Sequence, residues 1–142
     1  NACGHSGVTM RSGLVSLLTG ESTISSVVGS RVYVGKAPQG AILPHIVLTQ
    51  MDSNELPALD GHGSLRAVTC DIVCKAERSV TAESLAKIVR QYIDDYTGTA
   101  GSETIDAVIV NGETDAYEEP VDGSDIGIHA VTIDATIQYQ ES

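Results

Sequence analysis

The clearest pattern of hydrophobic positions lies between residues 81 and 96. Apolar residues recur there every three or four positions and form one continuous stripe, which predicts an amphipathic helix. The stripe consists of Leu85, Ile88, Val89, Tyr92, Ile93 and Tyr96. Thr81 is suited to be the N-cap of this helix, and Glu83 would lie in its first turn. We expect the striped face to pack against a sheet.

Two other segments alternate strictly between apolar and polar residues. In residues 65–75 the apolar set is Val68, Cys70, Ile72 and Cys74, and in residues 128–140 it is Val131, Ile133, Ala135, Ile137 and Tyr139. Such alternation is typical of strands with one face on the core and one face toward solvent. Shorter β-rich runs at 31–34, 44–51 and 104–111 predict three further strands.

The remaining hydrophobic runs near the start predict two helices. Residues 11–19 have helical spacing and end before Gly20, and a shorter helical run follows and ends at Gly29. Residues 52–64 are rich in Gly, Pro, Asp and Asn, so we expect a loop or a wide hairpin connection there. Residues 112–125 are expected to form a long acidic loop or an irregular edge. Strands and helices therefore do not alternate regularly. This order favours an α+β fold with a mainly antiparallel sheet and two main helices packed on one face.

Length and composition are those of one domain. The chain has 142 residues, and single domains most often contain about 100 to 150. Phe and Trp are absent, so the core must consist mainly of Val, Ile, Leu and Ala. Residues 1–9 have no periodic pattern, and we interpret them as a leader, an expression remnant or an upstream extension. We expect residues 10–142 to form a single domain.

Charge is distributed unevenly along the chain. Residues 1–90 hold all eight Lys and Arg residues and seven acids, whereas residues 91–142 hold twelve acids and no Lys or Arg. A surface as acidic as this last third repels phosphate, which argues against a specific grip on nucleic acid. The acids could also serve solubility alone.

The three cysteines do not indicate a disulfide or a zinc site. Cys70 and Cys74 lie on the same face of one predicted strand, about 13 Å apart, which is beyond disulfide reach. We predict that both are small core residues in a protein from a reducing compartment. No apolar run is long enough to span a bilayer, so we expect a soluble, unexported chain.

Candidate catalytic and metal-binding residues are few. His62 lies in a glycine-rich loop near Asp60 and Ser64, but this spacing is not that of a catalytic triad. The acidic segment around Asp122 and Asp125 lacks the ligand spacing of an EF-hand loop and is expected to be an acidic turn. A weak cation site among Glu118, Glu119, Asp122 and Asp125 stays open as an alternative. No phosphate-binding glycine loop and no zinc-protease motif occurs. We therefore predict no cofactor, no structural metal and no catalytic activity.

A series of short motifs resembles the tail-completion, or tail-terminator, proteins of long-tailed bacteriophages. The first motifs are the Val27–Tyr33 turn into a strand, the Ala37-Pro38 loop and the Pro44–Leu48 strand. Later motifs are the strand Val68–Ala76, the helix Ala82–Ile93, the segment Asp115–Glu118 and the final alternating strand. One departure is His45, where the family often has Tyr or Phe. The resemblance covers nearly all of residues 11–140.

This resemblance implies a structural virion protein and not an enzyme. Members of the family cap the head-proximal end of the tail tube, form hexameric rings and join the tail to the head. The resemblance therefore implies contacts with other copies of the chain, with the tail tube protein and with the head connector, while DNA passes through the ring. The expected location is the virion neck, after assembly in the host cytoplasm, for either a phage or a prophage.

Loops and acidic residues are the candidate contact sites under this interpretation. The predicted interface residues are Arg31, Lys36, Pro38, Gln39, Leu56, Pro57 and His62. The predicted acidic lining of the channel is Glu113, Asp115, Glu118, Glu119, Asp122 and Asp125. Two alternatives stay open: another neck or minor tail component, and, in a different class, a small metal-dependent enzyme centred on His62.

Overall fold

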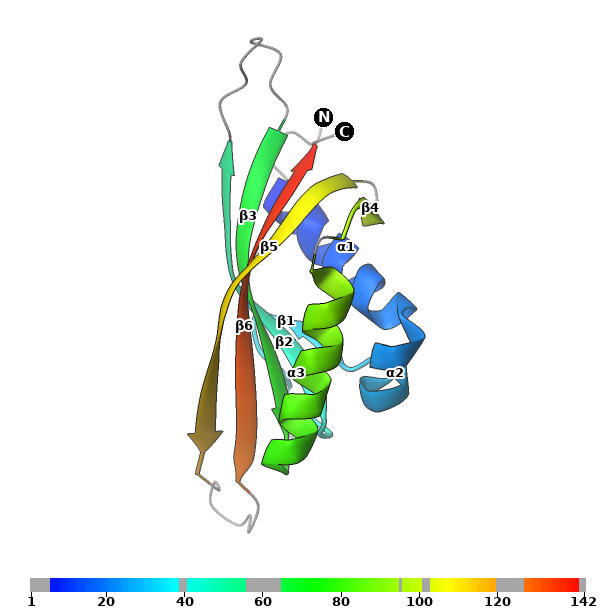
Figure 1. The fold of residues 1–142 in the computed structure, drawn as a ribbon. Coiled ribbons are helices and arrows are strands. Elements are labelled where there is room, and N and C mark those ends of the chain that lie inside the picture. The colour runs from blue at the N-terminus through cyan, green and yellow to red at the C-terminus, as the bar shows by residue number, and fades with distance from the viewer. Residues whose placement is uncertain are drawn as a thin grey trace.

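The computed structural model describes residues 6–38, 41–55, 65–94, 96–100, 103–119 and 127–140. Three helices and six strands occur in this part of the chain, in the order α1 (Ser6–Gly20), α2 (Ser22–Val28), β1 (Val32–Val34), β2 (His45–Glu55), β3 (Leu65–Ala76), α3 (Ser79–Ile93), β4 (Gly98–Ala100), β5 (Glu103–Glu118) and β6 (Ile128–Gln140). In Figure 1 the sheet is seen nearly edge on, and the helices lie to its right.

The six strands form one sheet in the order β1-β2-β3-β6-β5-β4. β1 and β2 are parallel, and every other neighbouring pair is antiparallel. The predicted α+β class and the mainly antiparallel sheet are therefore confirmed. β6 lies between β3 and β5, so the C-terminal strand completes the centre of the sheet after α3 has crossed it.

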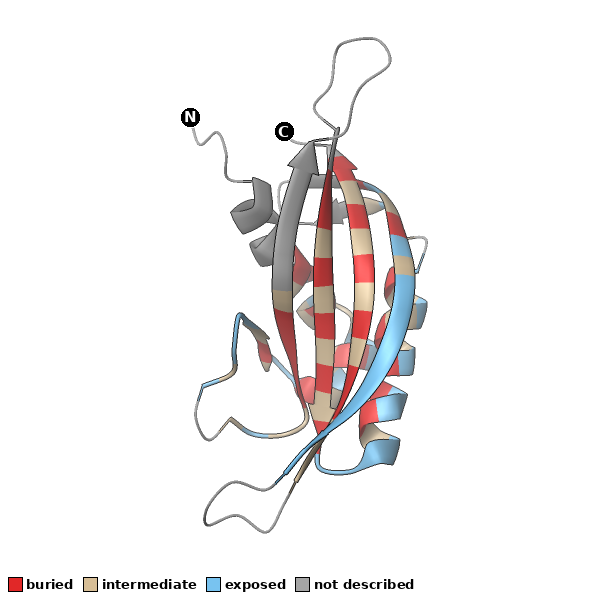
Figure 2. Cartoon of the chain, turned by 90° about the vertical axis from the view of Figure 1, so that its left-hand side faces the viewer, coloured by how far each residue is buried: buried red, intermediate tan, exposed pale blue. Residues whose placement is uncertain are grey.

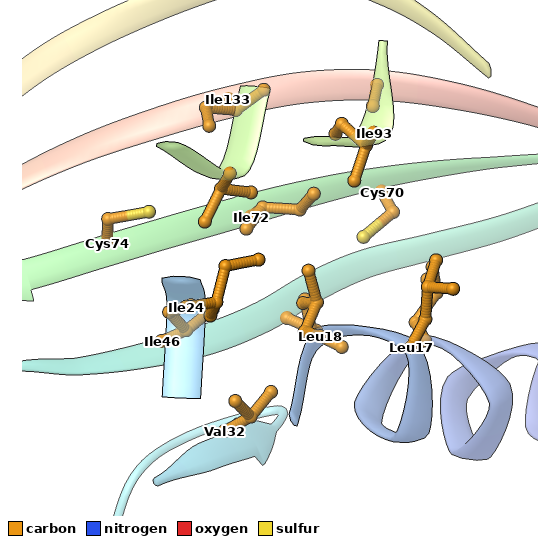
Figure 3. Close-up of a cluster of buried hydrophobic side chains, with 14 of the residues drawn as sticks. Leu17, Leu18, Ile24, Val32, Ile46, Cys70, Ile72, Cys74, Ile93 and Ile133 are labelled. Atoms are coloured by element: carbon orange, nitrogen blue, oxygen red, sulfur yellow. The ribbon is translucent and has the colours of Figure 1, made fainter. Parts of the chain in front are cut away.

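The core lies between the helices and one face of the sheet. Figure 3 shows Leu17 and Leu18 of α1 and Ile24 of α2 close to side chains of β1, β2 and β3. The predicted inward sets of β3 and β6 are all buried, which confirms both alternation patterns. Cys70 and Cys74 are free thiols within this core, as predicted. Burial raises the pKa of each thiol to about 12, so neither is reactive in the folded state.

Helix α3 carries the predicted stripe but begins and ends earlier than expected. Leu85, Val89 and Ile93 are buried, and Ala82 and Ala86 join them on the buried face. The prediction of Thr81 as the N-cap was wrong, because the helix begins at Ser79 with Arg78 at the N-cap and no side-chain cap hydrogen bond. Consequently Glu83 lies beyond the first turn.

The N-terminal helices differ from the prediction mainly in length. α1 begins at Ser6, within the segment set aside as a leader, and not at Arg11. It ends at Gly20 as predicted. α2 ends before Gly29, whose φ of 61° is in the left-handed region that favours glycine.

Of the two alternatives for residues 112–125, an acidic loop or an irregular edge, the structure shows the irregular edge for residues 112–118. β5 continues through Glu118 and pairs with β6 from Thr104 to Glu118, apart from Asp106 and Asn111. Register shifts between Ile105 and Ala107 and between Val110 and Gly112 bend the strand. The short strand β4 was not predicted, since the segment around it was expected to be a flexible connection.

Candidate interaction surfaces

The second face of the sheet has no described helix over it. Figure 2 looks onto this open face, and the described helices lie behind the strands. The outward residues of β3 and β6 are partly exposed: Thr69, Asp71, Val73, Lys75, Thr132, Asp134, Thr136 and Gln138. Of the predicted outward residues only Ala67 is buried. A sheet face of this size without a covering layer is available for contact with other chains.

Two aspartates face each other at the centre of the open face. Asp71 of β3 pairs directly with Asp134 of β6, so two carboxylates occupy neighbouring positions on one face. The pKa of Asp71 is raised by burial and then by the charge of Asp134. The Oδ1 atom of Asp134 is buried and has no hydrogen-bond partner among the described residues. The like charges cost stability, and they make the centre of this face acidic.

A groove of about 570 Å³ occupies one end of the open face. Its walls are the segment between β1 and β2 on one side and the end of β5 on the other, and strands β2, β3 and β6 form its floor. Apolar side chains dominate the lining: Ala37, Pro38, Ala41, Leu43, Val47, Val73, Ala116, Ile128 and Ala130. Lys75 and Glu118 also line the groove and form an ion pair, with 3.0 Å between Nζ and Oε2.

Arg31 anchors the segment between β1 and β2. Its Nε donates to the carbonyl oxygen of Pro44 at 3.0 Å, and its Nη2 donates to that of Val27 at 3.3 Å. The Leu43–Pro44 peptide bond is cis, and Gly35 has a φ of 87°. Arg31 is half-buried and holds its own chain in place, and its role at an interface stays a prediction. Lys36 and Pro38 are exposed, and Ile42 is 67% exposed.

His45 is buried at the floor of the groove. Its Nδ1–H donates to the carbonyl oxygen of Ile42 at 3.1 Å, and its ring meets that of Tyr33 edge to face with centroids 5.5 Å apart. The Nε2 atom is buried without a partner among the described residues. Burial lowers the pKa of His45, and the charges of Lys75 and Arg31 act in the same direction. The imidazole is therefore a neutral structural group, which explains how it can replace the aromatic residue common at this position.

The predicted acidic lining does not lie on one face of the sheet. Glu113 and Asp115 pair with Ile133 and Val131 of β6, so they point to the helical face, whereas Glu118 is on the open face. Arg90 of α3 approaches Glu113 with 2.9 Å between Nε and Oε2, although its N–H is not aligned for a hydrogen bond. Glu119 is exposed.

Several predicted site residues lie outside the described part of the chain. They are Gln39, Leu56, Pro57, His62, Asp122 and Asp125. The alternative of an enzyme centred on His62 therefore stays untested by the geometry. Within the described ranges, no three His, Cys, Asp or Glu side chains are grouped so that they could hold a metal ion. None of the helices described has the length and apolar character needed to cross a membrane.

The groove was not predicted from the sequence. The groove depends on the spatial meeting of residues 35–43 with residues 116–118, which are far apart in the sequence. In the second half of β5, Glu113, Asp115 and Tyr117 alternate with Thr114, Ala116 and Glu118. Since neither set is apolar, periodicity of burial could not reveal a strand.

A family model for the tail completion protein gp17 matches residues 12–132 of the chain. The chain belongs to the tail completion protein gp17 family. The resemblance noted in the sequence is thereby confirmed. Membership of this family indicates a structural protein of a phage tail. Structural virion proteins are generally not enzymes.

Two solved structures are similar to this tail completion protein in fold. The first is titled "Virion of native gene transfer agent (GTA) particle", with a TM-score of 0.69, 12% identity, and coverage of 99% of this chain and 100% of that one. The second, whose title states no function, has a TM-score of 0.57, 13% identity, and coverage of 98% and 99%. A comparison with curated proteins gives no match. The family and the first structure together support a place in a phage-like virion.

Proposed function

We propose that this tail completion protein forms a closed ring at the head-proximal end of the tail tube, where it stops tube growth and joins the tail to the head. The main support for the proposal is that the two faces of the sheet, and its two edges, are different from each other. One face packs on the helices, the other is open, and the two ends of the sheet differ in chemistry. A ring needs such unlike surfaces, because each copy must offer one patch to the copy before it and a different patch to the copy after it.

The proposed partners are other copies of the chain, the tail tube protein and a connector or neck protein of the head. Six copies are expected, because related tail-terminator proteins form hexameric rings. The ring would be in the virion neck after assembly in the host cytoplasm. Membership of the family and the similarity to a protein of a virion particle support this location.

The open face is the surface that we place toward the channel. It carries Asp71 and Asp134 at its centre and Glu118 at one end. An acidic wall lets DNA phosphates pass without adhering. This placement replaces part of the sequence-based lining, since Glu113 and Asp115 point to the other face.

Electron microscopy tests the proposal. Purified protein is imaged alone and after mixing with purified tail tubes from the same phage. We expect rings of six copies, either free or attached to one end of the tubes. Another neck or minor tail component would instead give a different copy number or bind elsewhere on the tail. Protein that never binds a tube end and never forms a ring would contradict the proposal.

A further inference from the structure

The two edges of the sheet, at β1 and at β5, are both open, and they differ in charge and shape. At one end, β4 covers only residues Glu103–Ile105 of β5. Residues 111–118 of β5 have no strand partner on their outer side among the described residues, and all of them are exposed. An exposed edge of this length is a ready template for another chain.

The other end consists of β1 and the segment that connects it to β2. In Figure 2 this segment stands out to the lower left, beyond the last strand of the sheet. It presents Lys36, Pro38 and Ile42 to solvent, and Ile42 is the most exposed large apolar residue in the described chain. The segment is therefore both basic and apolar.

Register places the two ends at the same level. Val32 of β1 pairs with Ile46, and Ile46 pairs with Cys74. Cys74 pairs in turn with Val131, and Val131 pairs with Asp115 of β5. β1 and the part of β5 around Asp115 thus lie opposite each other across the full width of the sheet. A rotation about an axis along the strands brings the β1 end of one copy next to the β5 edge of another.

Charges at the two ends are complementary. Lys36 is exposed and makes no ion pair with any described residue, and the same holds for Asp115 and Glu119 on the β5 side. Tyr117 on that edge is 50% exposed and offers a surface for Ile42. Pairing of two β5 edges with each other would place acids against acids, so the edge favours a basic partner over itself.

We propose that residues 35–38 and 41–43, between β1 and β2 of one copy, dock on the β5 edge, residues 111–119, of the next copy. The contact joins Lys36 to the acids of the neighbour and covers Ile42 against its Tyr117. This inference rests on the proposed ring, and it names the surface through which one copy binds another.

Matched apolar variants test the contact. Ile42→Ser and Val80→Ser each remove an exposed aliphatic side chain, since the two are 67% and 66% exposed, but Val80 belongs to α3 and not to either end of the sheet. Assembly on purified tail tubes is measured by electron microscopy and by the protein concentration needed for half-maximal capping. We expect Ile42→Ser to raise that concentration about tenfold and Val80→Ser to leave it unchanged.

Charge-reversal variants give a second test that does not depend on the apolar contact. Lys36→Glu and Asp115→Lys should each weaken assembly several-fold, and the double variant should recover part of the loss because opposite charges again face each other. Arg78→Glu and Asp94→Lys are the controls, because both residues are exposed at the ends of α3. Circular dichroism establishes that every variant is folded.

The outcomes separate the contact from the function. If the unsubstituted protein caps tubes and the Ile42, Lys36 and Asp115 variants cap as well as their controls, the contact is wrong and the ring stands. If the unsubstituted protein forms no ring and caps no tube, both proposals are wrong.

Discussion

At the scale of single residues, His45 couples folding to pH. Burial lowers its pKa below the ordinary value, so the unfolded chain binds a proton more readily than the folded one. Stability should therefore fall as the pH drops below about 6.5 and should level off below the folded-state pKa.

Urea unfolding at a series of pH values measures this effect. His45→Asn preserves a donor near the carbonyl of Ile42 and removes the titrating group, so we expect it to flatten the acid side of the stability profile. His129→Asn is the matched control and should keep the slope. An equal acid loss in the His45 variant would show that another group is responsible.

Tyr139 offers a second residue-scale test. It is fully buried in β6, and its hydroxyl has no hydrogen-bond partner among the described residues. Tyr139→Phe removes an unsatisfied polar atom, so we expect the free energy of unfolding to stay equal or to rise by up to about 1 kcal/mol. A loss of more than about 1 kcal/mol in chemical denaturation would show that the hydroxyl does have a partner.

At the scale of elements, two glycines that end helices should respond differently to substitution. Gly29 has a φ of 61°, which costs a residue with a Cβ about 1 kcal/mol. Gly20 closes α1 without a positive φ, and a Cβ there would meet no atom within 4 Å. Thermal unfolding should show a lower Tm for Gly29→Ala and an unchanged or higher Tm for Gly20→Ala. Equal losses in both variants would contradict this account.

Helices and strands were predicted well from the sequence where one buried face makes apolar residues recur at regular intervals. The stripe of α3 and the alternation of β3 and β6 follow directly from contact with one core. Thr81 failed as an N-cap because the helix begins at Ser79, with Arg78 at the N-cap and no side-chain cap hydrogen bond. The sequence left the second half of β5 open between a loop and an irregular edge, because its side chains are exposed on both faces.

Some features depended on contacts between distant segments. The sheet order, with β6 between β3 and β5, and the parallel pairing of β1 with β2 are set by which strands meet in space. The groove beside His45 needs both the segment after β1 and the end of β5. Local sequence patterns contain no information on contacts between distant segments. Single residues such as Lys36 and Pro38 could therefore be proposed from the sequence, but the groove that they line could not.

At the scale of the whole molecule, the acidic open face should ease the passage of DNA. Particles carrying Asp71→Lys and Asp134→Lys together should assemble but release DNA more slowly, because the lysines attract phosphate. Release is measured by the rise in fluorescence of a DNA dye after ejection is triggered. Asp94→Lys is the control on the surface of the helical layer. An unchanged rate of DNA release in the double variant would show that the open face does not line the channel.

The central claim is that this chain ends the growth of the tail tube. Tube seeds are incubated with the purified protein, tube protein is then added, and tube lengths are measured by electron microscopy. We expect tube lengths to remain those of the seeds once every end is occupied, while seeds incubated without the chain continue to grow. Continued elongation at the same rate in the presence of saturating protein would contradict it.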